Sequence, residues 1–153
     1  LIRMGELNNS SLVARPLGRF RWVTCASPDY LREYGVPSSP EALSQHRAVH
    51  YFSGQARRAD EFRFVRHGET FSVPVSGNAA VNETGLYIKM CLAGFGLAQL
   101  AENIVADHLQ EGRLVEVLTD WQPPPVPVTL LYPHQRFLSP AVRAFAEWMS
   151  EVV

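Results

Sequence analysis

Surplus charge, cysteine and long apolar runs are all scarce in this sequence. The formal net charge is −1 at pH 7, whereas a chain that grips a DNA backbone needs clustered surplus cations. We therefore expect no direct contact between these residues and nucleic acid. No stretch reaches the ~18 to 20 continuous apolar residues of a membrane helix, and no charged-then-apolar leader opens the chain. A membrane partner is accordingly not expected.

The two cysteines and five histidines do not form any recognisable site motif. Cys25 and Cys91 lie far apart in apolar surroundings, so neither a disulfide framework nor a metal or redox motif is indicated. We expect buried free thiols in a cytoplasmic protein. The histidines include no HExxH pattern and no close pair with cysteine or carboxylate. We therefore predict no metal and no other cofactor.

The length and composition are those of a folded globular protein. A chain of 153 residues with 46% hydrophobic residues can bury a core as one domain or as two small lobes. Its first residue is Leu1 rather than methionine, and it opens inside an apolar segment. This pattern predicts a fragment whose N-terminus has been cut from a longer protein.

Extended and helical patterns alternate along the chain, which predicts an α/β fold with a mostly parallel sheet. Proline follows serine at two predicted helix starts, Ser27-Pro28 and Ser139-Pro140. Residues 62–65 and 70–75 flank a predicted hairpin turn at His67-Gly68. Four prolines in residues 121–127 indicate a stiff connector. Together with a second switch near residues 15–21, this connector predicts two lobes joined by two crossovers.

Residues 84–93 are apolar on nearly every side, which predicts a helix in the middle of the protein rather than on its surface. Gly94-Phe95-Gly96 follows this helix and precedes a strand. A nucleotide-binding glycine loop has the reverse order, strand and then helix. The glycines are therefore interpreted as a helix stop.

No motif of a catalytic nucleophile is visible. The sequence contains no GxSxG elbow, and Ser10-Ser11 has no recognisable base nearby in sequence. We predict that the protein is not an enzyme. A small α/β enzyme remains an alternative, because a catalytic triad can assemble from residues far apart in sequence.

The strongest candidate site is the run Val81, Asn82, Glu83 and Thr84, where a predicted strand enters a helix. Ligands of open α/β sheets bind beyond the carboxyl ends of strands, and helix N-termini there offer free N–H groups that favour a small anion such as a carboxylate. Ser27 offers the same geometry at its own helix start. Capping by Asn82 or Thr84 is the alternative. Glu83 argues against a strongly anionic ligand unless its side chain points away or accepts from the ligand.

Two aromatic residues, Tyr51 and Phe52, stand at the end of another predicted strand. They are candidates for the wall of a ligand cleft. Packing into the core explains them equally well.

Six stretches in series resemble the LysR-type transcriptional regulators. They are residues 2–17 (similar to IRxGxLxDSSLxARxL), 26–31 (ASPxYL), 35–43 (GxPxxPxDL), 81–98 (VNDxxALxxAALAGLGIA), 112–118 (GRLVxVL) and 138–145 (LSPxVRAF). Asn9 and Ala101 depart from the usual aspartate and proline of this pattern. The chain therefore resembles, over nearly its whole length, the effector-binding domain of this family.

The resemblance implies a type 2 periplasmic-binding-protein-like fold with two α/β lobes and a central cleft. Residues 22–122 would form lobe two, and residues 1–21 and 125–153 would form an incomplete lobe one. The winged helix-turn-helix DNA-binding domain would precede Leu1. The second-lobe contribution to the effector site would fall near Ser27, Tyr51, Phe52, residues 81–84 and Gln99.

The function implied is the sensing of a small, organic-acid-like effector, with self-association to a dimer or tetramer and DNA binding through the absent N-terminal domain. Because missing partner strands would leave a sheet edge unpaired, we also expect pairing between chains or disorder in lobe one. A solute-binding protein of a transport system is the alternative with the same architecture.

Overall fold

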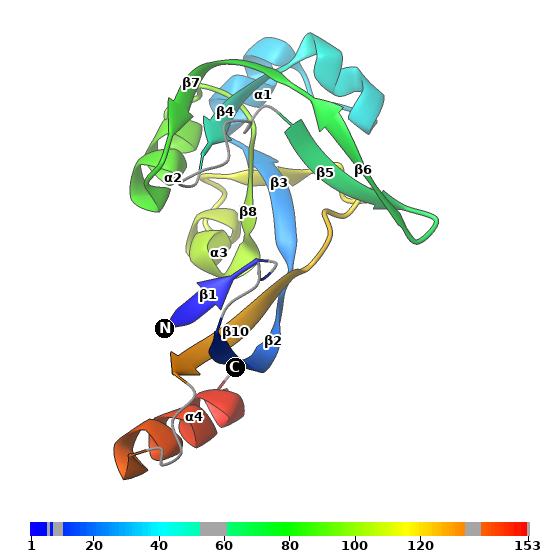
Figure 1. Ribbon diagram of the computed structural model, residues 1–153. Helices are drawn as coiled ribbons and strands as arrows, with labels where there is room; N and C mark the ends of the chain where they lie inside the picture. The colour runs from blue at the N-terminus through cyan, green and yellow to red at the C-terminus, as the bar shows by residue number, and fades with distance from the viewer. Residues whose placement is uncertain (6, 8–10, 53–60, 134–138, 153) are drawn as a thin grey trace. The chain divides into compact units, whose positions relative to one another are not determined.

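A computed structural model describes residues 1–5, 7, 11–52, 61–133 and 139–152, and they form two compact units (Figure 1). We call residues 1–20 with 125–153 the terminal unit, and residues 21–124 the inner unit. Each unit is described by itself below.

The terminal unit is a three-stranded antiparallel sheet with one helix. The strands lie in the order β1 (Ile2–Met4), β10 (Val126–Pro133) and β2 (Leu12–Phe20). Helix α4 (Pro140–Val152) begins after Ser139, whose Oγ accepts from the N–H of Val142 at 3.3 Å. This bond confirms the predicted serine-proline helix start.

The core of the terminal unit is small. Its buried members are Leu17, Val128, Leu130 and Ala146. Large apolar side chains on the same elements remain exposed, among them Ile2, Met4, Phe145 and Trp148. Burial of apolar area is the main stabilising term of a fold, so this unit gains little stability from its own core.

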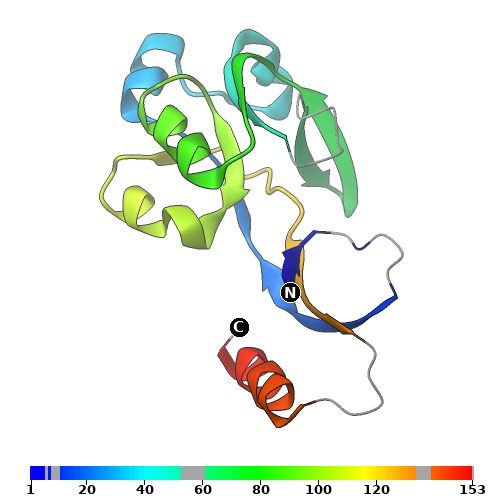
Figure 2. The same ribbon diagram turned by 60° about the vertical axis from the view of Figure 1, so that its left-hand side comes forward.

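The inner unit contains most of the secondary structure. Its strands are β3 (Trp22–Ala26), β4 (Arg47–Tyr51), β5 (Glu61–Arg66), β6 (Glu69–Pro74), β7 (Ser76–Val81), β8 (Ala98–Ala101) and β9 (Val115–Val117). Its helices are α1 (Pro28–Tyr34), the 3₁₀ helix η1 (Pro40–Gln45), α2 (Thr84–Leu92) and α3 (Glu102–Gln110). In both views α2 and α3 lie on one side of the unit and the β5–β6 hairpin on the other (Figure 2).

The prediction of a mostly parallel sheet is wrong for the hydrogen-bonded pairs. β4 pairs parallel with β7, and Ala48 bridges parallel to Leu97 at the start of β8. β3, however, lies between β8 and β9 and is antiparallel to both. Strands β4, β7, β8 and β9 therefore share one direction, as strands joined by helices do. The pairs become antiparallel because β3 enters the sheet from the opposite direction.

The β5–β6 hairpin closes at the predicted turn. Arg66 pairs with Glu69, and the two residues between them, His67 and Gly68, have positive φ values of 51° and 78°. Two consecutive positive φ angles are the requirement of a tight two-residue hairpin turn, which favours glycine. The buried rings of Phe62 and Phe64 attach this hairpin to the core of the inner unit.

Helix α2 is not buried on all sides, contrary to the prediction. Tyr87 and Cys91 are its buried residues, whereas Leu86 is exposed. The helix contacts β4, β7 and β8 on its inner side. Its outer side is not covered by a further layer of the residues that the structure describes. Apolar composition alone does not reveal how many layers cover a helix.

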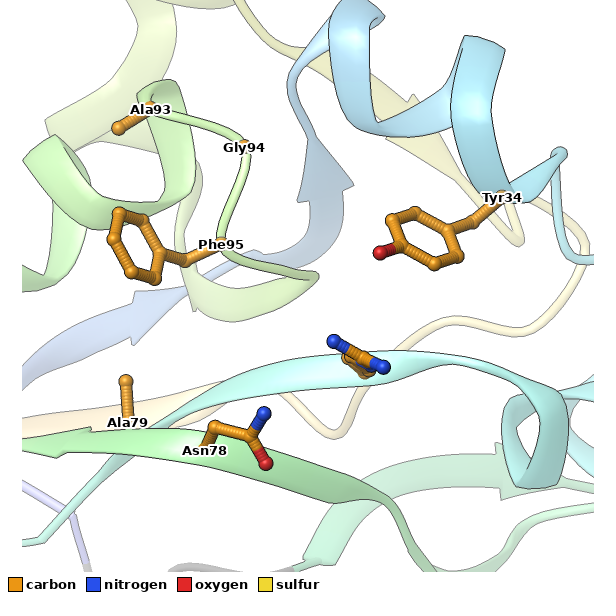
Figure 3. A pocket seen from close by; sticks show the side chains of 7 residues that line it. Tyr34, Asn78, Ala79, Ala93, Gly94 and Phe95 are labelled. Carbon is orange, nitrogen blue, oxygen red and sulfur yellow. The ribbon is translucent and has the colours of Figure 1, made fainter.

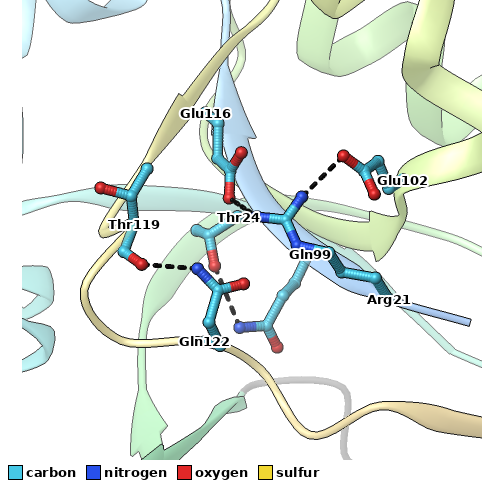
Figure 4. A network of polar contacts seen from close by, with 7 residues as sticks. All are labelled: Arg21, Thr24, Gln99, Glu102, Glu116, Thr119 and Gln122. Carbon is cyan, nitrogen blue, oxygen red and sulfur yellow. Dashed lines mark hydrogen bonds and ion pairs between the residues drawn. The ribbon is translucent and has the colours of Figure 1, made fainter.

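Arg21 fastens the start of β3 to two other elements (Figure 4). One guanidinium nitrogen lies 2.7 Å from Glu102 of α3, and the other lies 2.6 Å from Glu116 of β9. The backbone N–H of Glu102 also donates to the Arg21 carbonyl at 2.9 Å. This network ties α3 and β9 to the residue where the inner unit begins.

Candidate functional site

The ends of β4 and β7 bring most of the predicted site residues together. Tyr51 is the register partner of Val81, and the N–H of Phe52 donates to the Val81 carbonyl at 2.9 Å. The hydroxyl of Tyr51 lies 3.4 Å from the carbonyl oxygen of Asn82, to which it donates. We call Tyr51, Phe52 and residues 81–84 the strand-end cluster.

Exposure separates the members of the strand-end cluster. Val81 is buried and belongs to the core, whereas Asn82, Glu83 and Thr84 are exposed. The exposed fractions of Tyr51 and Phe52 are 36% and 38%. Core packing alone therefore does not account for the two aromatic residues. Both aromatic residues leave part of their surface exposed at this strand end, next in the sheet to the exposed Asn82.

A second tyrosine supports this cluster from the core. The ring centroids of Tyr51 and Tyr87 are 5.4 Å apart with a tilt of 56°, which is a favourable aromatic arrangement. Tyr87 is buried, and burial raises the pKa of its hydroxyl. Its oxygen accepts from the N–H of Gln99 at 3.0 Å, so α2, β4 and β8 meet at this ring.

The side chain of Glu83 caps α2. Its two carboxylate oxygens accept from the N–H groups of Gly85 at 2.7 Å and of Leu86 at 2.6 Å. These bonds lower the pKa of the Glu83 carboxyl below its usual value. The cap is thus Glu83 and neither Asn82 nor Thr84. Two of the N–H groups that an anionic ligand would use are already bound to a carboxylate of the protein.

The side chain of Gln99 is occupied within the inner unit. Its amide nitrogen donates to Thr24 Oγ1 at 3.2 Å (Figure 4) and to the Arg63 carbonyl at 2.9 Å, and its amide oxygen accepts from the Arg63 N–H at 3.0 Å. These three bonds join β8 to β3 and β5. They assign the Gln99 side chain a structural role in this arrangement.

Ser27 does not join the strand-end cluster. β3 is antiparallel to β8 with Cys25 opposite Ala98, so Ser27 lies near the start of β8, whereas the cluster lies at the carboxyl ends of β4 and β7. Ser27 is buried, and its Oγ accepts from the N–H of Tyr30 at 3.2 Å as the cap of α1. Capping therefore accounts for this residue.

A cavity of about 370 Å³ opens beside the first residue of β4 and the middle of β7 (Figure 3). We call it the Arg47 cavity, and it is lined by Tyr34, Arg47, Asn78, Ala79, Ala93, Gly94 and Phe95. β4 rises about 3.3 Å per residue, so its first residue lies ~13 Å from its last. The Arg47 cavity is thus distinct from the strand-end cluster.

Sequence reasoning missed this cavity because its lining comes from four separate segments. The glycine-rich stop after α2 forms one wall, and Gly94 has the positive φ of 83° expected of such a stop. Phe95, between the two glycines, is 58% exposed. A large aromatic residue in a helix stop was the available signal, because such a turn does not itself require one.

The cysteines and histidines do not form a metal site in the part of the chain that the structure describes. Cys25 and Cys91 are buried and free. A hydrogen bond with Cys91 and burial raise the pKa of the Cys25 thiol, which keeps it protonated and unreactive. His134 lies outside the described residues. No described helix is long and apolar enough to cross a membrane.

The arrangement of strands and helices is that of known regulatory domains. The chain is similar to the regulatory domain of CrgA, a LysR-type transcriptional regulator from Neisseria meningitidis, with a TM-score of 0.82 and 25% identity over 99% of this chain and 74% of that one. Its fold class is the type 2 periplasmic-binding-protein-like α/β fold of these domains, as predicted. The family description "LysR substrate binding domain" matches residues 1–153. The chain therefore belongs to the LysR substrate binding domain family, which confirms the resemblance found in the sequence.

Two curated relatives connect the family to transcription. YhjC of Escherichia coli strain K12, named an uncharacterized HTH-type transcriptional regulator, is 35% identical over 153 residues, or 100% of this chain and 51% of the relative. An HTH-type transcriptional repressor of Pseudomonas aeruginosa strain UCBPP-PA14 is 36% identical over 151 residues, or 99% of this chain and 48% of the relative. The chain thus spans about half the length of these relatives. Proteins of this family are transcriptional regulators, a class that acts by binding and generally not by catalysis.

Proposed function

We propose that this chain is the effector-sensing part of a LysR-type transcriptional regulator. It binds a small metabolite. The inner unit is lobe two of this domain, and the terminal unit belongs to lobe one. The regulator acts in the cytoplasm without catalysing a reaction. DNA binding is the task of a helix-turn-helix segment outside these residues, because the sequence carries a net charge of −1 and no surplus of cations.

One observation carries the location of the effector site. In a domain of a substrate-binding family, two aromatic rings and one amide remain exposed together where parallel strands end. Ligands of α/β sheets bind at such ends. Tyr51 and Phe52 supply apolar contact area, and Asn82 supplies both a hydrogen-bond donor and an acceptor. The Gln99 side chain joins strands of the sheet and the Ser27 side chain caps α1, so the atoms of both are engaged within the inner unit.

The chemistry of the cluster also narrows the class of effector. We expected a carboxylate at the N-terminus of α2, but the Glu83 side chain binds two of the N–H groups there and brings a negative charge. We infer that the part of the effector nearest α2 is uncharged or donates hydrogen bonds. A carboxylate elsewhere on the effector is compatible with this arrangement.

Self-association completes the proposal. The terminal unit exposes large apolar side chains on both β1 and α4, including Met4 and Trp148. Exposed apolar groups of this size are often covered by a partner. We propose that copies of the regulator form a dimer or tetramer, and that the effector shifts their arrangement through its different affinity for two states.

The test is the Asn82→Ala substitution in the full-length regulator that contains this chain. We expect weaker induction, measured as the effector concentration for half-maximal reporter expression, with unchanged operator affinity in a gel-shift assay. Asn103→Ala is the matched control, because Asn103 is an exposed asparagine on α3 outside the cluster. An effector concentration for half-maximal expression that is unchanged in Asn82→Ala would contradict the assignment.

A further inference from the structure

The Arg47 cavity combines one cation, two aromatic rings and one amide. The guanidinium carbon of Arg47 lies 5.6 Å from the ring centroid of Tyr34. Figure 3 shows the Tyr34 ring pointing from α1 toward the middle of the view, the Phe95 side chain extending from the turn after α2 away from Tyr34, and Asn78 on β7 below them, and all three residues line the cavity. These groups come from α1, β4, β7 and the turn after α2. Sequence-distant groups of complementary chemistry therefore converge on one hollow.

The charge of the Arg47 cavity has one sign. Arg47 is the charged residue of its lining, and the lining contains no aspartate or glutamate. Among the described residues, no carboxylate forms an ion pair with Arg47, whereas Arg21 pairs with two carboxylates and Arg32, Arg66 and Arg113 with one each. A guanidinium binds carboxylate and phosphate groups in a planar, two-pronged manner. The cavity thus offers an anion a partner that the protein does not itself supply.

The rest of the lining fits a flat apolar body. Ala79, Ala93 and Gly94 are small, so the walls that bring bulk into the cavity are the two rings. The volume of about 370 Å³ lies at the small end of known ligand pockets. Aromatic rings stack favourably on one another at centroid distances of 4.5 to 7 Å. A compound with one ring and one acidic group would satisfy the rings and Arg47 together.

We propose that the Arg47 cavity is a second small-molecule site, which takes a small aromatic acid. The acid group pairs with the Arg47 guanidinium, the ring packs against the aromatic lining of the cavity, and the Asn78 amide donates to a remaining oxygen. This site is independent of the strand-end cluster. It shares no lining residue with the cluster, and its charge preference is the reverse of that set by Glu83.

The experiment uses the full-length regulator and two probes of similar size and opposite charge, phenylacetate and phenethylammonium. Binding is measured by ligand-detected NMR titration, which does not depend on any transcriptional response. We expect phenylacetate to bind with a Kd on the order of millimolar, the range of a fragment of this size. Phenethylammonium is expected not to compete with it.

The variants separate the Arg47 cavity from other binding. Arg47→Gln is expected to weaken phenylacetate binding about tenfold, because it removes a charge-assisted hydrogen bond. Phe95→Ala, at an exposed position, tests the ring contact without touching the fold and is also expected to weaken binding. Arg32→Gln, on the same helix as Tyr34 but outside the lining, and Asn82→Ala are expected to bind as the wild type does.

Three results would overturn the proposal. The first is that phenylacetate does not bind at tens of millimolar. The second is that the wild type, Arg47→Gln and Phe95→Ala bind it equally well. The third is that Asn82→Ala loses binding while Arg47→Gln retains it. The last result would place the probe at the strand-end cluster. If Arg47→Gln fails to fold by circular dichroism, the comparison of Phe95→Ala with the wild type decides.

Discussion

Replacing Tyr30 by phenylalanine deletes one oxygen atom that serves two partners. The Tyr30 side chain is 1% exposed, and its oxygen accepts from the backbone N–H of Arg47 at 2.9 Å. The same hydroxyl lies 2.9 Å from Nδ1 of His46. Burial lowers the pKa of His46, so its ring is neutral near pH 7 and Nδ1 can accept the hydroxyl proton. This hydroxyl joins α1 to the segment that enters β4.

The cost of Tyr30→Phe follows from the groups left behind. The Arg47 N–H and the His46 nitrogen would both lose their partner, and a buried polar group without one costs about 1 to 3 kcal/mol. The Arg47 end is partly buried, so water recovers some of that loss. We expect the free energy of unfolding to fall by about 2 kcal/mol. The midpoint of thermal unfolding would fall by roughly 4 to 8 °C for a chain of this size.

Urea unfolding followed by tryptophan fluorescence measures this change. Tyr34→Phe is the matched control, because Tyr34 stands one turn further along α1 and is more than one-third exposed. Its substitution is expected to change the free energy of unfolding by less than about 0.5 kcal/mol. If Tyr30→Phe unfolds within that same margin of the wild type, the two hydrogen bonds do not stabilise the fold as reasoned.

Three further predictions concern the inner unit. The pKa of His46 is lower in the folded than in the unfolded chain, so the unfolded chain takes up the proton first as the pH falls below about 6.5, and the free energy of unfolding decreases there. His46→Gln should make the free energy of unfolding less dependent on pH between 7.5 and 5. Gly77→Ala should cost about 2 to 3 kcal/mol in urea unfolding, because a Cβ there would overlap the Ala48 carbonyl oxygen and lie 2.6 Å from His50 Nε2; a change below about 0.5 kcal/mol would contradict this packing. Arg21→Gln removes two ion pairs of partly exposed side chains and should cost about 1 kcal/mol at low salt and less at 1 M salt, and a cost independent of salt would argue against the ion pairs.

Local features of the fold followed from short sequence signals. The helix starts at Ser27-Pro28 and Ser139-Pro140 and the hairpin turn at His67-Gly68 agree with the predictions. Each depends on residues close together in sequence, such as a cap or a turn glycine. The direction of β3 and the open outer side of α2 depend on which elements become neighbours. The spacing of apolar residues along the sequence contains little information about which elements become neighbours.

The candidate site likewise has a part that could be predicted from the sequence and a part that could not. The run from Val81 to Thr84 could be found because a strand end and a helix start adjoin in sequence, and Tyr51 could be added through the resemblance to the LysR family. The edge on which Ser27 lies could not be predicted, because it depends on the antiparallel entry of β3. Whether these residues bind an effector stays a prediction. The Arg47 cavity had no contiguous signal, since its lining joins residues as distant as Tyr34 and Phe95.

The Glu83 side chain that caps α2 competes with any anionic ligand for the N–H groups at the start of this helix. A free acid could bind the Gly85 and Leu86 amides only by displacing the Glu83 carboxylate. Because that carboxylate is part of the chain, its local concentration at these amides is high. Only an acid whose other contacts offset the free energy of displacing Glu83 would bind there. The Glu83 side chain thus disfavours the binding of a simple organic anion at the N-terminus of α2.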